Sequence, residues 1–316
     1  MKWKILFFAL IWLCSLGLAH AHFTMVFPGK HVEVSASDYL AELGETKTLW
    51  ILWGHPYEHQ LFDCPVMPEV SVRDPEGNVE KLEPKQITVE GKIAYEVSFT
   101  VEKMGDYVVF VKLEVPEHDL VDYTKAVIHC GEEAWFGWDA EVGQEVEIIP
   151  YTRPYGIEEG FVFTGKALYN GEPLVGASVE VEKYHTKEVA EQLVEEAEKK
   201  FAWDPAMMYT RVTTTNEKGE FAYTLDEAGI WFIGATKEVK DGLDKRGVLI
   251  VPVFEEFPKE TIAPTKELES LEKRISSLES KVGSIKPVSP SLAYSAIGIS
   301  IIAILLAFAS LTRKKV

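Results

Sequence analysis

Short runs of alternating apolar and polar residues, rich in β-branched and aromatic side chains, constrain the fold of this chain most strongly. Between Thr46 and Pro150 these runs read TLWILW, EVSVRD, AYEVSFTV, DYVVFVKLEV, KAVIHC and EVEIIP. Turn-forming segments such as DPEG at 74–77 and MGD at 104–106 separate them. Strands of this length and spacing predict an antiparallel β-sandwich over residues 22–151, a usual size for one hydrophobic core.

A second β-sandwich is predicted over residues 158–254. The segment PYTRPYGI, with two prolines and a glycine, precedes it and has the composition of a hinge. Strand-like runs follow, with a turn at Asn170-Gly171. At about 186–202 an acidic segment interrupts the strands, and we expect an amphipathic helix there that packs on the sandwich. Its expected apolar face consists of residues at helical spacing: Val189, Leu193, Ala197 and Phe201.

The first 21 residues have the form of a secretory signal peptide. Lys2 and Lys4 precede an apolar stretch that is too short to span a membrane, and small residues follow it. Cleavage after Ala21 matches the A-x-A pattern and would make His22 the first residue. Cleavage after Ala19 is the alternative and would leave His20 first.

The C-terminal part predicts attachment to a membrane. Apolar residues alternate at spacings of three and four over 265–286, which predicts a short coiled-coil stalk. Residues 292–311 carry no charge and have the length of a transmembrane helix. The basic tail at 312–316 favours the cytoplasmic side. We therefore expect a single-pass protein of the cell membrane, with its N-terminal domains outside the cytoplasm and homo-oligomers formed through the stalk.

The charge and the motifs exclude some classes of function. Net charge is -18, and loss of Lys2 and Lys4 with the signal peptide would take it to -20. A chain this acidic is not a general nucleic-acid binder, because phosphate backbones are held by clustered Lys and Arg. The sequence also contains no GxxxxGK[ST] loop, GxSxG elbow or HExxH motif. We expect a binding protein with no catalytic residues rather than an enzyme.

Residues able to bind metal concentrate in the first predicted domain. The segment WGHPYEHQLFDCP, residues 53–65, places His55 and His59 in a loop after an apolar strand, where both can act as metal ligands. The alternative is that both only form hydrogen bonds that order the loop. Cys64 and Cys130 are the two cysteines beyond the signal peptide, and outside the cytoplasm a disulfide between them is expected. It would bring His129 near the loop, although strand alternation points His129 away from Cys130.

Signal cleavage would itself create a chelating group. With His22 first, its α-amine and imidazole can bind one transition metal ion together. With His20 first, an amine, two amide nitrogens and the imidazole of His22 suit square-planar copper or nickel. We expect His31 and His118 to be solvated. Three residues beside the helical insertion are weaker candidates for soft ligands: His185, Met207 and Met208.

Several of these features together resemble a known family. The start AHAHF, Pro28, WGHPYEH and DYTKAVI resemble extracytoplasmic proteins described as periplasmic components of nickel/cobalt uptake systems, over roughly His22 to Val253. The second predicted domain, with NGEPLVGASVEVEKY and TTTNEKGEFAYTL, is similar to transthyretin-like or carboxypeptidase-regulatory-like sandwiches. The resemblance implies that His22, His55 and His59 bind nickel or cobalt for a transporter. A stalk and anchor are less typical of soluble members and favour a tethered receptor.

Three functions are therefore compared. The first is a membrane-anchored transition-metal protein that binds nickel or cobalt, with copper or zinc as alternatives, and supplies an uptake transporter. The second is a structural or adhesive surface protein in which the histidines are incidental. The third is a copper redox enzyme with an N-terminal histidine brace, which would need a second histidine at an open, solvent-reachable copper.

Overall fold

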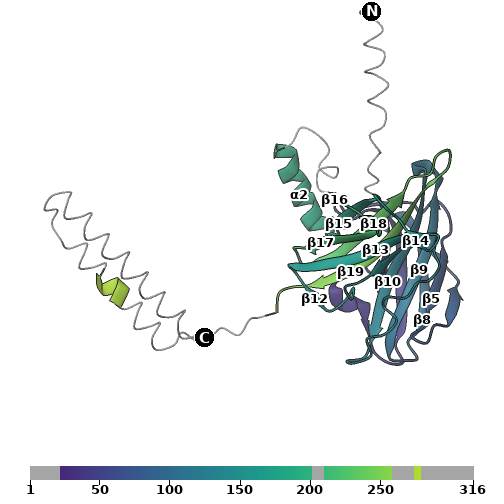
Figure 1. The fold of residues 1–316 in the computed structure, drawn as a ribbon, viewed down its shortest axis with the longest axis horizontal. Coiled ribbons are helices and arrows are strands. Elements are labelled where there is room, and N and C mark those ends of the chain that lie inside the picture. Colours follow the sequence, from purple (N-terminus) through teal and green to yellow (C-terminus); the bar gives the residue numbers. More distant parts are fainter. Residues whose placement is uncertain (1–21, 201–209, 258–273, 279–316) are drawn as a thin grey trace, which may run out of the picture. The chain divides into compact units, whose positions relative to one another are not determined.

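Strands dominate the structure, a computed structural model that describes residues 22–200, 210–257 and 274–278 (Figure 1). The expected signal peptide, transmembrane segment 292–311 and tail 312–316 lie outside these residues. So does the expected stalk, 265–286, apart from helical residues 274–278. Among the described residues, no helix has the length and apolar character required to cross a membrane.

The first sheet contains β1, the first strand of the described residues. Its strands follow the order β1-β3-β8-β7, and β4 pairs with β3. All of these pairs are antiparallel, as the alternating pattern predicts. The bounds of the strands are β1 (Phe23–Pro28), β3 (Thr46–His55), β4 (Gln60–Phe62), β7 (Lys85–Val89) and β8 (Lys92–Thr100).

The second sheet is the largest of the three. Its order is β16-β15-β18-β19-β10-β9-β5-β6, with β12 paired to β19 and β2 paired to β10. Its strands are β2 (Leu40–Ala41), β5 (Glu69–Arg73), β6 (Val79–Leu82), β9 (Gly105–Val115), β10 (Leu120–Cys130), β12 (Ile157–Glu158), β15 (Ser178–Lys183), β16 (Arg211–Thr214), β18 (Gly229–Lys237) and β19 (Asp244–Phe254).

A third, smaller sheet has the order β11-β13-β14, with β17 paired to β13. Its strands are β11 (Val146–Pro150), β13 (Phe161–Tyr169), β14 (Glu172–Pro173) and β17 (Glu220–Leu225). The predicted turn at Asn170-Gly171 joins β13 to β14, and both of its residues have positive φ, as a tight hairpin turn requires.

The middle of the large sheet is buried on both faces. In β19, Val248 and Ile250 belong to the core shared with the first sheet, whereas Leu249 and Val251 belong to the core shared with the third sheet. Residues of β18 alternate between the two cores in the same way. Strand alternation therefore supplies two hydrophobic cores on opposite sides of one layer.

The all-β prediction is confirmed, but the expected division at 22–151 and 158–254 differs from the structure. β10, in the first predicted domain, pairs in parallel with β19, in the second, and the two strands lie side by side in Figure 1. β11 was assigned to the first domain and instead pairs with β13. The strands up to Phe257 form one compact unit, because the central sheet is common to both cores.

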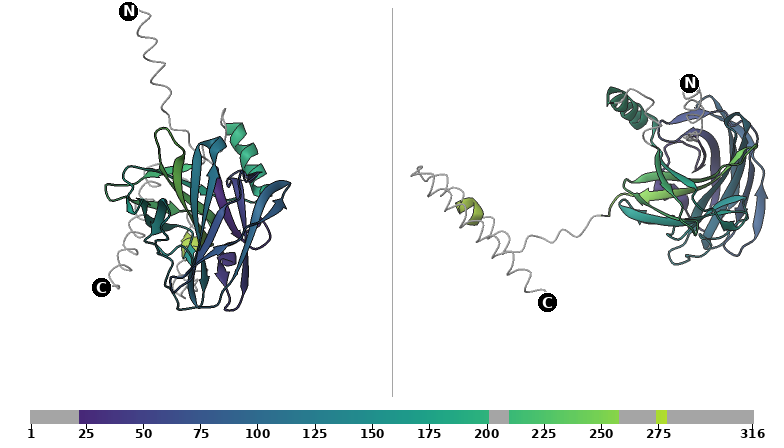
Figure 2. Two further views of the ribbon diagram at one scale, coloured as in Figure 1. Left: turned by 90° about the vertical axis from the view of Figure 1, so that its right-hand side faces the viewer. Right: turned by 45° about the horizontal axis from the view of Figure 1, so that its top comes forward.

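The helical insertion is present as α2 (Lys187–Lys200), which lies outside the strand layers (Figure 2). Its buried residues are Ala190 and Ala197, whereas Val189, expected on the packed face, is exposed. The prediction is therefore confirmed for Ala197 and wrong for Val189, whose place on the packed face is taken by Ala190. Two short 3-10 helices occur at Ala36–Tyr39 and Pro116–His118, and the second of them connects β9 to β10.

Candidate metal centre

Three imidazole rings meet at one end of the strand layers. The ring centroid of His22 lies 3.9 Å from that of His55 and 4.3 Å from that of His118. The rings are inclined by 42° and 47°, and all three side chains are partly buried. They come from three separate places in the chain: the residue before β1, the last residue of β3, and the 3-10 helix between β9 and β10.

The pairing of β1 with β3 brings His22 and His55 together. Phe23 lies opposite Gly54, so the next residues outward on the two strands are neighbours. Gly54 also permits the tight β3–β4 hairpin, because a Cβ atom there would lie 2.1 Å from the backbone carbonyl oxygen of Gln60. The glycine in the GHPYEH segment therefore determines where His55 leaves the strand.

Aromatic side chains surround the three rings. His22 stacks on Trp53 with centroids 5.7 Å apart and an interplanar angle of 13°, and its ring lies 5.1 Å from that of Phe62. The ring of Trp53 is also 5.9 Å from that of His118. Because Trp53 is buried, it provides a rigid apolar wall on which the imidazoles pack.

The β3–β4 turn is held in place by the end of β15. The amide of Tyr57 donates to the carboxylate of Glu182 at 2.8 Å, and the amide of His185 donates to the carbonyl of Pro56 at 3.1 Å. Burial raises the pKa of Glu182 to about 8, and the neighbouring charge of Glu180 adds to this rise. The loop that follows His55 is therefore ordered by contacts distant in sequence.

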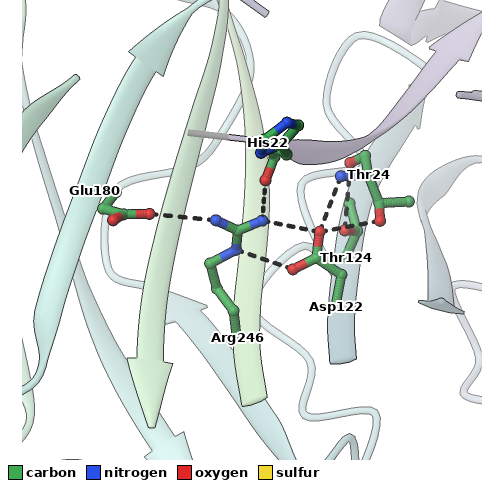
Figure 3. A network of polar contacts seen from close by, with 6 residues as sticks. All are labelled: His22, Thr24, Asp122, Thr124, Glu180 and Arg246. Carbon is green, nitrogen blue, oxygen red and sulfur yellow. Dashed lines mark hydrogen bonds and ion pairs between the residues drawn. The ribbon is translucent and has the colours of Figure 1, made fainter. Parts of the chain in front are cut away.

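A buried ion-pair network lies directly beneath His22 (Figure 3). Arg246 donates from Nε to Asp122 Oδ1 at 2.9 Å and from Nη2 to Asp122 Oδ2 at 3.0 Å. Its Nη2 also donates to the backbone carbonyl of His22, and its Nη1 donates to Glu180 at 3.2 Å. Burial disfavours the guanidinium charge, but the carboxylates of Asp122 and Glu180 outweigh it and raise the pKa of Arg246.

The second histidine of the GHPYEH segment has different neighbours from the first. The ring of His59 is 2.9 Å from the hydroxyl of Tyr184, 3.1 Å from the carbonyl of His185 and 3.2 Å from the carboxylate of Glu90. Its backbone has a left-handed φ of 50°. This left-handed turn places His59 in a hydrogen-bonded set, whereas His55 faces His22.

His129 belongs to another buried group. Its Nδ1 lies 2.7 Å from Asp106 Oδ1, and its ring stacks on Tyr155 at 4.3 Å with an interplanar angle of 16°. The disulfide expected to draw it toward the hairpin is not formed. Cys64 and Cys130 are both free buried thiols, the first next to β3 and β8 and the second paired with β9 and β2.

Sequence reasoning missed His118, which was expected to be solvated. Nothing in the surrounding residues, LEVPEHDL, distinguishes it from a surface histidine. Its position depends on β10, which is linked to β1 by a hydrogen bond of 3.3 Å from Thr124 Oγ1 to the carbonyl of Thr24. The one usable signal is its place in a turn after a strand, where a loop can contribute a ligand.

The donor set fits a transition metal ion in its chemistry. Imidazole nitrogen suits nickel, copper, zinc and iron. Two imidazoles bound cis at a metal–nitrogen distance of about 2.0–2.1 Å have ring centres about 4.5 Å apart. The observed 3.9 and 4.3 Å are close to this value. In the described part of the chain, however, no group of three or more His, Cys, Asp or Glu side chains has a metal-site geometry, so binding requires the rings to turn.

A family profile covers most of this architecture. The profile described as "Domain of unknown function (DUF4198)" matches residues 19–238, more than two thirds of the chain, and includes all three clustered histidines. The chain belongs to the DUF4198 family. Membership alone does not support an assignment to nickel or cobalt uptake, since the family is uncharacterised.

Other comparisons of this DUF4198 protein are less specific. No curated protein matches it. Among solved structures it is similar to trypsin-activated alpha-2-macroglobulin from Escherichia coli, with 12% identity and a TM-score of 0.21 over 74% of this chain and 16% of that one. It is also similar to a 1.5-MDa bacterial ice-binding adhesin, with 9% identity and a TM-score of 0.24 over 78% and 70% of the two chains. Yersinia pseudotuberculosis adhesin InvE matches with 8% identity and a TM-score of 0.22 over 78% and 66%. At these TM-scores the similarities carry no conclusion about this chain.

Proposed function

We propose that the processed protein binds a first-row transition metal ion outside the cytoplasm, through His22, His55 and His118. The observation that carries this proposal is the meeting of three imidazoles from separate parts of the chain, within 3.9 and 4.3 Å of the central ring. His59 and His129 are left out of the ligand set, because each is held by its own buried hydrogen bonds.

Cleavage after Ala21 would complete the donor set. The new α-amine and the imidazole of His22 belong to one residue, so they can form a chelate with a single ion. The rings of His55 and His118 would add two further nitrogens. An all-nitrogen set of this kind suits nickel, copper, zinc or cobalt better than calcium or magnesium, which prefer oxygen ligands. Nickel or cobalt remains our first choice, on the resemblance described above.

The expected ends of the chain support a role in metal capture. A signal peptide and a single C-terminal anchor would hold the metal centre at the outer surface of the membrane, where it could pass its ion to an uptake transporter. The acidic composition, with a net charge of -18, favours the approach of cations over anions. In this proposal the metal ion is the transported cargo and not a catalytic cofactor.

The alternatives make different predictions. A copper histidine-brace enzyme needs copper that oxygen can reach. The partial exposure of the three histidines is compatible with such access. It would consume oxygen in the presence of copper and a reductant. A display or adhesion protein would have no metal affinity beyond that of scattered surface histidines.

Isothermal titration of the processed chain with nickel, cobalt, copper and zinc tests the proposal. We expect a dissociation constant in the micromolar range or lower for at least one ion, and a loss of affinity of roughly 10- to 100-fold in each of His22→Ala, His55→Ala and His118→Ala. His31→Ala is the matched control, since His31 is an exposed histidine that follows the far end of β1 from His22. Equal affinity in the control and the three variants would reject the site.

A further inference from the structure

β1 is the edge strand of the first sheet, so among the described residues one side of its backbone has no strand to bond with. The polar groups on this open side are nevertheless bonded by side chains of the central sheet. The amide of Thr24 donates to Asp122 Oδ2 at 2.9 Å, and the carbonyl of Thr24 accepts from Thr124 Oγ1 at 3.3 Å. The carbonyl of His22 accepts from Arg246 (Figure 3). Side chains of β10 and β19 thus replace a missing neighbouring strand.

Arg246 is the residue that connects these contacts. It is fully buried, and its guanidinium lies 4.2 Å from the ring centroid of Phe23, the residue after His22. A planar fork of five donors can bind both oxygens of Asp122 and still reach the His22 carbonyl and Glu180. A lysine ammonium has three donors around one point and cannot make this set of contacts.

The network acts on the backbone of His22 and not on its ring. A hydrogen bond to the carbonyl of His22 and another to the amide of Thr24 fix the peptide units on both sides of Phe23. The Cα atom of His22, from which the α-amine and the side chain extend, is then held in place before any metal arrives. None of these contacts uses the amine, so the network is compatible with both the uncut and the processed chain.

We propose that Arg246, together with Asp122, is a positioning residue that preorganises the His22 terminus for metal binding. This inference rests on the proposed function, because it assigns a role in the same site. Two buried carboxyl groups, of Asp122 and Glu180, face the guanidinium and hold it against the backbone of His22. In other metal sites, residues that hydrogen-bond to a metal ligand orient that ligand. Loss of such a residue weakens metal binding by about 10- to 100-fold.

The test compares Arg246→Lys with Lys125→Gln in the processed full chain. Lys125, on β10, is also a buried cation, and its hydrogen bonds go to Glu147 at 2.9 Å and to the carbonyl of Ala140. Copper(II) is the probe, because its electron paramagnetic resonance spectrum reports ligand geometry. We expect Arg246→Lys to weaken copper binding by about 10-fold or more and to change the spectrum. Lys125→Gln should lower the melting temperature and leave the affinity and the spectrum unchanged.

Unchanged affinity and spectrum in Arg246→Lys would overturn the inference, and so would an equal change in Lys125→Gln. If Arg246→Lys does not fold, Thr124→Val decides, because it removes one contact to Thr24 from the same network without removing a charge. A copper spectrum that differs from that of the parent protein supports the inference, and an unchanged spectrum overturns it.

Failure of the proposed function gives a separate result. If the parent protein binds none of the four ions, amide hydrogen exchange at Thr24 is measured without metal. Faster exchange in Arg246→Lys than in Lys125→Gln supports the positioning of the terminus. Equal exchange in both overturns it.

Discussion

His22 and His55 lie across from each other at the end of the β1–β3 pair, with ring centroids 3.9 Å apart. Neither strand could bring them together alone. The register that places Phe23 opposite Gly54 leaves the two histidines as the next pair outward, and the hairpin after β3 then turns the chain away. A metal site at this point depends on backbone geometry as much as on the imidazoles.

Gly54→Ala should damage the site through the hairpin. The added Cβ would meet the carbonyl oxygen of Gln60 at 2.1 Å, so the turn must shift. We expect a loss of about 1–3 kcal/mol in the free energy of unfolding, typical of overpacking, and weaker metal binding. Chemical denaturation and titration measure the two effects. Gln60→Ala is the control, because it removes an exposed side chain and keeps the carbonyl; similar losses in both variants would contradict the prediction.

His59→Ala should lower stability and leave metal affinity nearly unchanged. The substitution removes hydrogen bonds to the buried hydroxyl of Tyr184 and to the exposed carboxylate of Glu90, so the free energy of unfolding should fall by about 1–3 kcal/mol. Asparagine tolerates the left-handed backbone at this position better than alanine, so His59→Asn should lose less. Thermal unfolding and metal titration are the measurements. A drop in affinity as large as that of His55→Ala would return His59 to the ligand set.

Glu182 should make the stability of the protein depend on pH. Its pKa is raised from 4.5 to about 8 in the folded state, so the folded protein holds the proton more tightly than the unfolded chain. The stabilisation is complete below pH 4.5 and is lost as the pH rises toward 8, by at most about 1.4 kcal/mol for each pH unit. Glu182→Gln keeps an oxygen acceptor for Tyr57 and should flatten this dependence. Glu172→Gln, at an exposed position, should follow the parent curve.

Cys64 should react slowly with alkylating reagents while the protein is folded. Burial, together with the charge of Asp63, raises the pKa of its thiol to about 12, so only about one molecule in ten thousand carries the thiolate at pH 8. Mass spectrometry after timed exposure to iodoacetamide measures the reaction. Val66→Cys places a thiol at an exposed position two residues away and should react readily. Comparable rates at both positions would contradict the burial of Cys64.

The sequence determined the class of local structure and indicated two residues of the candidate metal centre. Alternation in the β3 and β8 segments predicted strands, the Asn170-Gly171 pair predicted a hairpin turn, and helical spacing located α2. Local patterns of this kind reflect interactions between near neighbours, which one chain segment contains in full. The signal-peptide pattern and the GHPYEH loop likewise drew attention to His22 and His55.

Only the tertiary structure decided how the strands are shared between the two cores and which third histidine lies beside His22 and His55 in the candidate metal centre. Continuous apolar runs in β18 and β19 reflect burial on both faces, but a sequence does not state which strand lies beside which. The pairing of β10 with β19 joins segments more than a hundred residues apart, and that pairing makes one compact unit from two predicted domains. Long-range contacts also place His118 beside His22, and they place His59 against Tyr184 and Glu90 instead. The local composition of a segment indicates whether it will be buried. Which other segment covers it depends on how the whole chain packs.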